Sequence, residues 1–343
     1  MAIREESILI EPVFGYSKHG DIPYRPTIGE ILTEWVDAVN FVKYPSRSLT
    51  ALYVAFHCLG LVVTVIFFLK YGSLPNLLFM ITVVCVLGIL YNTVWYHRYC
   101  SHGSFKFSRP SFARIFLWTN PFVFREECYA IPHRLHHRLS ERAGDPYGPH
   151  LGWLGSYLAT ESSQKFNTAM TEKSYESVVR SIQHIGVPMN SYLKFKKTGS
   201  IETTKHYLTR LCFIHLFWIA LFFSLGGPDL LLAWYTSIFI MAFIIRDFNW
   251  RGHGGNFRSA KQRGWEFDTK SRALNQRVYG LTVGEWHDNH HKYPMSANNG
   301  FLRGQIDIAF QIIRLMHRLG IVESYMDARP IFEKECLRSP ANA

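Results

Sequence analysis

Four long apolar stretches, separated by polar and basic segments, dominate the pattern of the chain. Residues 51–69 and 74–96 contain no charged side chain, and the shorter stretches 211–227 and 230–245 meet at a Gly-Gly-Pro-Asp turn. A helix needs about 20 apolar residues, within roughly 17–25, to cross the hydrocarbon core of a bilayer. The aromatic flanks of the shorter stretches suit a membrane interface. The pattern therefore predicts two hairpins of membrane-spanning helices, with spans at about 51–70, 74–96, 207–227 and 229–248.

The alternative is a soluble protein with buried core helices. It is disfavoured because the two longest stretches exceed ordinary core helices, and because an aromatic content of 15% suits interfacial belts. The stretch Phe112–Phe124 contains Pro121 and is too short to span, so it predicts a helix lying in the membrane interface. The segment Ile28–Phe41 is a second candidate for an interfacial helix.

The basic residues indicate how the chain is oriented. The net charge is +11, and Lys and Arg are plentiful in 97–206 and 246–343, whereas the short loops 70–73 and 226–229 contain only Lys70. Loops rich in Lys and Arg face the cytoplasm, so both large polar segments, and both termini, are expected there, in the endoplasmic reticulum or a bacterial inner membrane. No nucleic-acid-binding signature accompanies the charge, which argues against a nucleic-acid partner.

This organisation predicts three regions. They are a cytoplasmic N-terminal arm (1–50), a main domain (51–325) with its cap formed by 97–206 and 249–325, and a C-terminal tail (326–343).

Histidines gather in three boxes. The first box is His97 and His102, the second is His133, His136 and His137, and the third is His287, His290 and His291. A random chain of this composition would hold two HxxHH patterns less than about once in a thousand. Neutral imidazole is a good ligand for iron, zinc and copper. An even number of spans puts all three boxes on one membrane face, so the sequence predicts one histidine-built metal site.

The spacing within the boxes indicates how many metals they serve. Residues i, i+3 and i+4 of a helix share a face, so the second and third boxes can each present ligands to one or two metals. His97 and His102 diverge by about 140° on an ideal helix, so they either reach different metals or require a local distortion. Eight histidines exceed the need of one four-coordinate zinc, which favours two metals. His253, after the fourth predicted span, would alone be an ordinary loop residue.

The boxes, their order and their placement around four spans resemble the membrane fatty acid desaturases, in particular the stearoyl-CoA desaturase-like branch. The resemblance extends over roughly 50–320. It includes His97-Arg98 in the first box, the second box continued as far as Asp145-Pro146, the stretch His150-Leu151-Gly152-Trp153-Leu154, and Gly284-Glu285 before the third box. Asn249 and His253 match the family's Asn-x-x-x-His. Cys100 stands where an aromatic is usual and Asp288 where asparagine is usual, and the loop after Pro146 is short, which leaves the acyl carrier open.

The resemblance implies a fold class and a site. The fold would be an all-α integral membrane protein with four transmembrane helices and a cytoplasmic helical cap that holds a histidine-rich di-iron site. Two iron ions (Fe2+) would be held by the boxes and His253, with Asn249 reaching a metal through water. The implied metal-site residues are His97, His102, His133, His136, His137, Asn249, His253, His287, His290 and His291.

The implied activity is an O2-dependent oxidoreductase reaction that introduces a double bond into a long acyl chain, carried on CoA, a carrier protein or a membrane lipid. Electrons would come from an external donor such as cytochrome b5 or ferredoxin with its reductase. A fatty acyl or lipid hydroxylase on the same scaffold remains an alternative. A zinc-binding or transport protein is disfavoured, because transport needs ionisable residues in the spans. Carboxylates that can orient the histidines are Asp145 and Glu285, with Glu126 and Glu127 as weaker candidates that would otherwise be surface charge.

Overall fold

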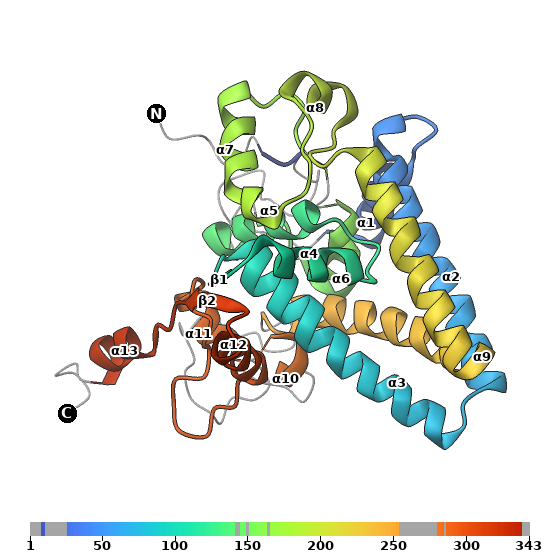
Figure 1. Cartoon of the computed structure of the whole chain (residues 1–343). Coiled ribbons are helices and arrows are strands. Elements are labelled where there is room, and N and C mark those ends of the chain that lie inside the picture. Colours follow the sequence, from blue (N-terminus) through green and yellow to red (C-terminus); the bar gives the residue numbers. More distant parts are fainter. Residues whose placement is uncertain are drawn as a thin grey trace.

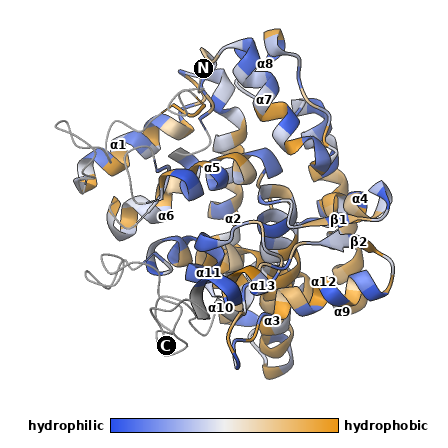
Figure 2. Cartoon of the chain, turned by 90° about the vertical axis from the view of Figure 1, so that its left-hand side faces the viewer, coloured by the Kyte–Doolittle hydropathy of each residue, from blue (hydrophilic) through white to orange (hydrophobic). Residues whose placement is uncertain are grey.

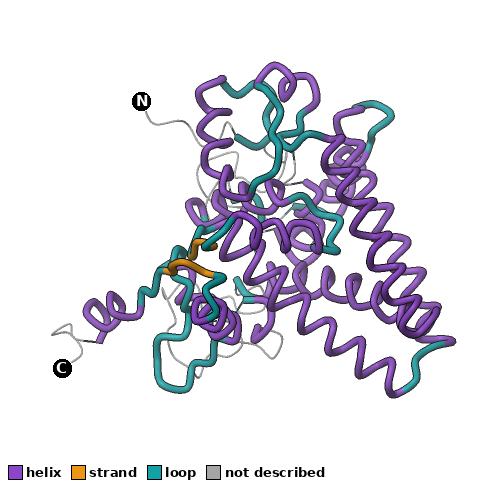
Figure 3. Tube along the Cα trace, in the orientation of Figure 1, coloured by secondary structure: helices purple, strands orange, loops and turns teal. Residues whose placement is uncertain are grey.

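A computed structural model describes residues 8–10, 26–140, 145–148, 151–162, 165–253, 280–284 and 286–337. Helices dominate these residues, and the sheet within them has two strands (Figures 1 and 3). The helices are α1 (Ile28–Val39), η2 (Pro45–Arg47), α2 (Ser48–Lys70), α3 (Leu74–Val86), η3 (Leu87–Ser101), α4 (Pro110–Thr119), α5 (Glu126–Leu139), α6 (Gly152–Ser162), α7 (Glu172–Ile182), η5 (Gln183–Ile185), α8 (Tyr192–Thr198), α9 (Thr204–Arg251), α10 (Gly280–Val283), α11 (His287–Lys292), α12 (Ile308–Arg318), α13 (Arg329–Phe332) and η7 (Glu333–Leu337). The strands are β1 (Phe105–Phe107) and β2 (Val322–Tyr325).

Three helices in the described part of the chain are long and apolar enough to cross a membrane: Pro45–Lys70, Leu74–Ser101 and Thr204–Arg251. Hydrophobic residues dominate α3 and α9, whereas α5 and α11 carry many hydrophilic ones (Figure 2). The first two helices coincide with the first predicted hairpin. The predicted third and fourth spans both fall within α9, which at 48 residues would extend about 72 Å if it were straight.

A sharp bend divides α9 into two arms. Gly226 and Gly227 have non-helical backbone angles, and Gly227 (φ 59°, ψ −149°) lies in a region that only glycine adopts readily. Pro228 follows and cannot continue the hydrogen-bonding pattern of the preceding turn. The first arm runs beside α2, and the second turns away beneath the cap (Figure 1). The bend lies at the Gly-Gly-Pro-Asp turn expected between the two spans.

The two turns of the predicted hairpins lie at the same end of the molecule. Asn76, at the start of α3, donates a hydrogen bond to Asp229, just after the bend in α9 (Nδ2 to Oδ2, 3.3 Å). Phe67, Met80 and Ala233 form a small buried cluster beside this contact. The other ends of α3 and α9 therefore point together toward the segments that carry the histidine boxes.

Short helices form a cap over those other ends. α5 packs on η3, and α6 packs on both α1 and the second arm of α9. A helix is present within the predicted segment 28–41 as α1, which begins with a capping box between Thr27 and Glu30. The predicted helix at 112–124 is shorter than expected: α4 ends at Thr119, because Pro121 and the extended backbone of Asn120 prevent its continuation.

A buried ion pair and the small sheet attach the C-terminal part of the chain to the first box. β1 pairs antiparallel with β2, with Phe105 opposite Tyr325. Arg98 donates two hydrogen bonds to the carboxylate of Asp307 (2.8 and 2.9 Å), and both side chains are almost fully buried. Asp307 also caps α12 by accepting from the N–H of Phe310. These contacts fix the segment after the third box relative to η3.

Candidate metal centre

Four helical segments bring the histidines of the three boxes and His253 to one place. The second box lies on α5 and the third on α11, so the helical interpretation of both HxxHH patterns is confirmed. The first box lies at the end of η3, and His253 follows the end of α9. Most of these histidines are buried, and the predicted meeting of the three boxes is present in the structure.

A π-helical distortion resolves the angular problem of the first box. η3 has i→i+5 backbone hydrogen bonds, and the N–H of His102 donates to the carbonyl of His97 (3.2 Å). This bond brings two residues five apart to the same side of the chain, which an ideal α-helix does not do. The ring centroids of His97 and His102 are 5.1 Å apart. Of the two sequence-based alternatives, a local distortion is the one observed, and both histidines join one group.

Five histidines form the first group. We call it the five-histidine group: His97, His102, His133, His137 and His290. Their Nε2 atoms form a chain of short contacts, with separations of 2.8 Å (His97 to His290), 2.9 Å (His290 to His137), 3.1 Å (His137 to His133) and 2.9 Å (His133 to His102).

Four histidines form the second group, which we call the four-histidine group: His136, His253, His287 and His291. Three of them, without His287, are close enough to share a metal ion, and Nε2 of His287 is 3.0 Å from Nε2 of both His253 and His291. The ring of His136 is 4.4 Å from that of His253, and no described group bonds its buried Nε2.

Helix geometry explains how each HxxHH box is divided. The first and last histidines of such a box lie about 40° apart around the helix axis, whereas the two adjacent ones lie about 100° apart. On α5, His133 and His137 join the five-histidine group and His136 joins the other. On α11 the assignment is reversed, since His290 joins the five-histidine group and the i, i+4 pair His287 and His291 joins the four-histidine group.

The Nε2 contacts fit metal ligands better than hydrogen bonds. An imidazole nitrogen has one direction in the ring plane, occupied by either a hydrogen or a lone pair. His290 and His133 each make two short Nε2 contacts, which one direction cannot satisfy as hydrogen bonds. Ligand nitrogens bound at roughly 2.0–2.1 Å to one metal, about 90° apart, lie about 3 Å from each other. The residues present therefore fit a metal-binding role.

Burial keeps these side chains in the form that binds metal. It holds the pKa of His102, His133, His137, His290 and His291 well below the usual value, and the neighbouring histidines lower it further. The imidazoles are therefore neutral near pH 7, and a neutral imidazole offers its lone pair to a metal.

A mostly apolar chamber of about 580 Å³ adjoins both groups. Its lining includes His97 and His133 from the five-histidine group and His253 and His287 from the other, together with Asn249. From there the chamber extends between α2 and both arms of α9. Its size is that of a small-molecule site, and its walls suit an apolar ligand.

Comparison with known proteins identifies the family. Residues 74–321, which include all ten predicted metal-site residues, match the fatty acid desaturase family model. The chain belongs to the fatty acid desaturase family. The desaturase is therefore an oxidoreductase, and its long apolar helices make it a membrane protein.

Several relatives named as desaturases or desaturase-like proteins resemble most of the chain. It is 28% identical over 254 residues to the Delta-9 desaturase-like 4 protein of Arabidopsis thaliana, covering 70% of this chain and 73% of the relative. It is 23% identical to an acyl-CoA 5-desaturase of Anemone leveillei, covering 75% of each chain. It is 21% identical to the sn-1 stearoyl-lipid 9-desaturase of a Synechocystis strain, covering 81% of this chain and 80% of the relative.

Asp145 and Tyr147 contact two box histidines at Nδ1, on the side of the ring away from Nε2. Oδ1 of Asp145 is 2.8 Å from Nδ1 of His136, and both side chains are fully buried. The hydroxyl of Tyr147 is 2.5 Å from Nδ1 of His133, while its ring stacks on His136 with centroids 4.4 Å apart. The expectation that Asp145 orients a box histidine agrees with this contact. Glu285 lies outside the described residues.

Two other predicted carboxylates have a different role. Glu126 and Glu127 are fully buried, so their interpretation as surface charge was wrong. Glu126 pairs with Arg210 of α9 (2.8 Å), and Glu127 pairs with Arg125 (2.9 Å). Burial raises the pKa of Glu127 to about 7. These pairs anchor the start of α5 and touch no box histidine in the described part of the chain.

Two basic side chains of the second box, Arg134 and Arg138, differ in exposure. Arg134 donates to the backbone carbonyls of Ser181 (2.8 Å) and Cys100 (3.1 Å), so it holds the cap together. Arg138 is exposed. Three other basic residues near the boxes, Arg142, Lys261 and Arg263, lie outside the described residues.

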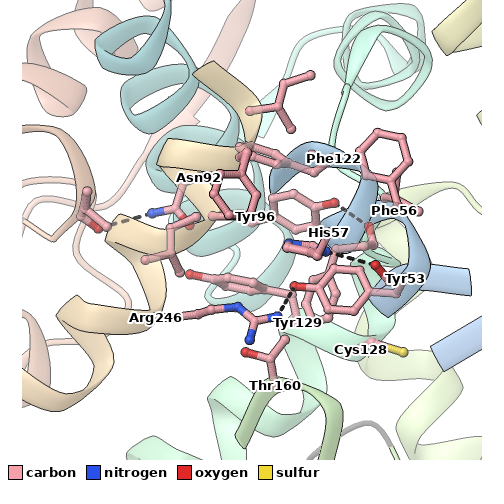
Figure 4. Close-up of a pocket in the computed structure, with 18 of the residues that line it drawn as sticks. Tyr53, Phe56, His57, Asn92, Tyr96, Phe122, Cys128, Tyr129, Thr160 and Arg246 are labelled. Atoms are coloured by element: carbon pink, nitrogen blue, oxygen red, sulfur yellow. Dashed lines mark hydrogen bonds between the residues drawn. The ribbon is translucent and has the colours of Figure 1, made fainter. Parts of the chain in front are cut away.

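Sequence reasoning did not find Arg246, a charged residue of the chamber wall. Arg246 of α9 is buried, pairs with Glu161 of α6 and donates to the hydroxyl of Tyr53 on α2 (3.1 Å) (Figure 4). Arg246 lies three residues before Asn249, and the available signal was a charged residue directly after the apolar stretch 230–245. Tyr147 had a weaker signal, its position two residues after Asp145.

Proposed function

We propose that this chain is an O2-dependent membrane fatty acyl desaturase whose histidines hold two iron ions. The five-histidine group would hold one ion. The four-histidine group would hold the other, with Asn249 reaching it through water. The convergence of Nε2 atoms beside an apolar chamber carries this proposal. Bound iron would supply the oxidising chemistry that breaks the C–H bonds.

The overall reaction requires electrons from outside. Two hydrogens leave adjacent methylenes, and O2 is reduced to two waters with two further electrons and two protons. The sequence contains no dinucleotide-binding GxGxxG motif. A separate protein such as cytochrome b5 or ferredoxin, with its reductase, would therefore deliver the electrons.

The protein itself binds and places the substrate. The apolar chamber walls replace water around the chain and leave its methylenes beside His97, His133, His253 and His287. Asp145 holds His136 in the tautomer that carries hydrogen on Nδ1, which leaves Nε2 for the metal. The names of the relatives include acyl-CoA and acyl-lipid substrates, so the substrate class proposed here is a long acyl chain on CoA, a carrier protein or a lipid.

The proposed arrangement has four membrane crossings, with the cap and both termini on the cytoplasmic side. The arms of α9 on either side of Gly226-Gly227 have lengths of about 33 Å and 36 Å at 1.5 Å per residue, and each matches a hydrocarbon core of about 30 Å. The contact of Asn76 with Asp229 supports placing both turns on the opposite side.

The test is expression in a host that lacks this activity, followed by gas chromatography of its fatty acids with double-bond location. New monounsaturated chains are expected, together with about two irons per purified protein. Hydroxylated chains without new double bonds would refute desaturation and favour the hydroxylase. Zinc alone, bound without oxygen consumption, would refute the iron assignment.

A further inference from the structure

A three-residue segment after the second box contacts both groups of histidines. It consists of Asp145, Pro146 and Tyr147. Asp145 bonds His136 of the four-histidine group (Oδ1 to Nδ1, 2.8 Å). Tyr147 bonds His133 of the five-histidine group (Oη to Nδ1, 2.5 Å). One short segment therefore reaches a histidine of each group.

Contacts within the segment hold these two side chains in fixed relative positions. Oδ1 of Asp145 also accepts a hydrogen bond from the N–H of Tyr147 (3.1 Å), and Pro146 between them has a restricted φ. The carbonyl oxygen of Tyr147 lies 3.1 Å from Nδ1 of His136, and the ring of Tyr147 stacks on that of His136. The segment therefore packs against His136 as one unit, which places the hydroxyl of Tyr147 at His133.

The hydroxyl oxygen of Tyr147 accepts a hydrogen bond from His133 when His133 binds a metal ion. Nε2 of His133 lies 2.9 Å from Nε2 of His102 and 3.1 Å from Nε2 of His137, so this nitrogen is the one that offers a lone pair to the metal. A neutral imidazole with its lone pair on Nε2 carries its hydrogen on Nδ1. The bond from Nδ1 to Tyr147 therefore fixes both the tautomer and the direction of the ring.

Other histidines of the five-histidine group have no contact of this kind in the described part of the chain. Nδ1 of His97, His137 and His290 is buried and has no hydrogen-bond partner among the described residues. Histidines that bind metals are usually oriented by a bond from the nitrogen that does not bind the metal. The hydroxyl of Tyr147 is therefore a main orienting contact for this group.

We propose that Tyr147 is a positioning residue that controls metal binding by the five-histidine group, while Asp145 controls metal binding by the four-histidine group. This inference rests on the proposed function, because it requires one ion in each group. Loss of an outer contact of this kind weakens metal binding about 10–100-fold. Each of the two residues should therefore affect one ion by that factor and leave the other ion in place, although they are neighbours in the same segment.

The experiment counts the ions that remain after a fixed chelator challenge, on the full-length protein in nanodiscs. The metal-free protein is loaded with Fe2+ in the absence of oxygen, and the chelator concentration lies just below the one that strips the native protein. Tyr147→Phe keeps the ring on His136 and removes only the hydroxyl, so it should retain about one ion instead of two. Asp145→Asn should also retain about one. The double variant should retain none, because the two losses fall on different ions.

Loading with Co2+ distinguishes the two ions. Co2+ takes the same nitrogen ligands as Fe2+, and its visible absorption depends on how many of them bind it. The ion left in Tyr147→Phe and the ion left in Asp145→Asn should therefore give different spectra. Tyr129→Phe is the matched control, because the ring of Tyr129 lies 5.6 Å from that of His133 but its hydroxyl bonds no box histidine among the described residues. This variant should retain both ions.

The outcomes separate this inference from the proposed function. Two retained ions in Tyr147→Phe overturn the inference, because the hydroxyl would then have no role in binding. One retained ion in the double variant, or identical Co2+ spectra of the two single variants, overturns it because both residues would act on the same ion. Loss of both ions in Tyr147→Phe overturns it because the effect would not be selective. Native protein that holds fewer than two ions before the chelator is added refutes the two-ion proposal, and the inference with it.

Discussion

The buried ion pair between Arg98 and Asp307 leads to a testable prediction about the thermal stability of the fold. Asp307→Ala would remove the carboxylate that accepts two hydrogen bonds from the guanidinium of Arg98, which is 1% exposed. Breaking a buried ion pair by removing one partner costs about 3–5 kcal/mol, and loss of the cap on α12 costs about 1 kcal/mol more. The sum, roughly 4–6 kcal/mol, corresponds to a fall of about 6–8 °C in Tm for a chain of 343 residues, at an unfolding entropy of roughly 2.1 cal/mol/K per residue.

The assay is the apparent Tm of the detergent-solubilised protein, followed by fluorescence-detected size exclusion after heating. Asp307→Asn retains an oxygen that can cap α12, so it should lose less than Asp307→Ala. Replacing both partners, by Arg98→Met with Asp307→Leu, should recover much of the loss, because no buried charge remains unpaired. Glu323→Gln, in the exposed pair with Lys106, is the control and should change little. A Tm for Asp307→Ala within about 1 °C of the native value would refute this reasoning.

Three further predictions concern the metal centre. His136→Ala should abolish desaturation and remove about one of two bound irons without affecting membrane insertion, as measured by metal analysis; full iron content would contradict its role as a ligand. Asp145→Asn should weaken iron binding about 10–100-fold, because an amide orients the ring of His136 less strongly than a carboxylate does. An unchanged iron affinity in a chelator competition would contradict this prediction. The metal-free protein should lose stability below about pH 6.5: burial lowers the pKa of His102, His133, His137, His290 and His291, so the unfolded chain takes up protons that the folded chain cannot. Each histidine contributes up to about 1.4 kcal/mol per pH unit, and a Tm that is constant between about pH 8 and pH 5 would exclude the effect.

Local periodicity explains what the sequence could predict. The uncharged stretches predicted the long helices, and the i, i+3, i+4 spacing predicted that two boxes lie on helices. Both predictions were possible because each signal depends on residues close together in the chain. The Gly-Gly-Pro-Asp turn predicted the bend in α9 for the same reason. The order of the boxes around these helices was enough to predict that they meet.

Features that depend on tertiary contacts were not predictable in this way. The π-helical hydrogen bond between His102 and His97 has no spacing signature, so the sequence left two alternatives for the first box. The burial of Glu126 depends on Arg210, 84 residues away in the chain. The contact of Tyr147 with His133 joins residues 14 positions apart, beyond the reach of helical periodicity.

The division of the boxes between two groups bears on where the reaction would take place. Each HxxHH box contributes to both groups, so α5 and α11 connect the two groups rigidly, and a displacement of either helix would move ligands in both. The chamber touches two histidines of each group, His97 and His133 on one side and His253 and His287 on the other. With iron in both groups, as proposed, an acyl chain in the chamber would pass along the boundary between them. Two adjacent methylenes at that boundary would then face the same centre, which is the arrangement that removal of two neighbouring hydrogens requires.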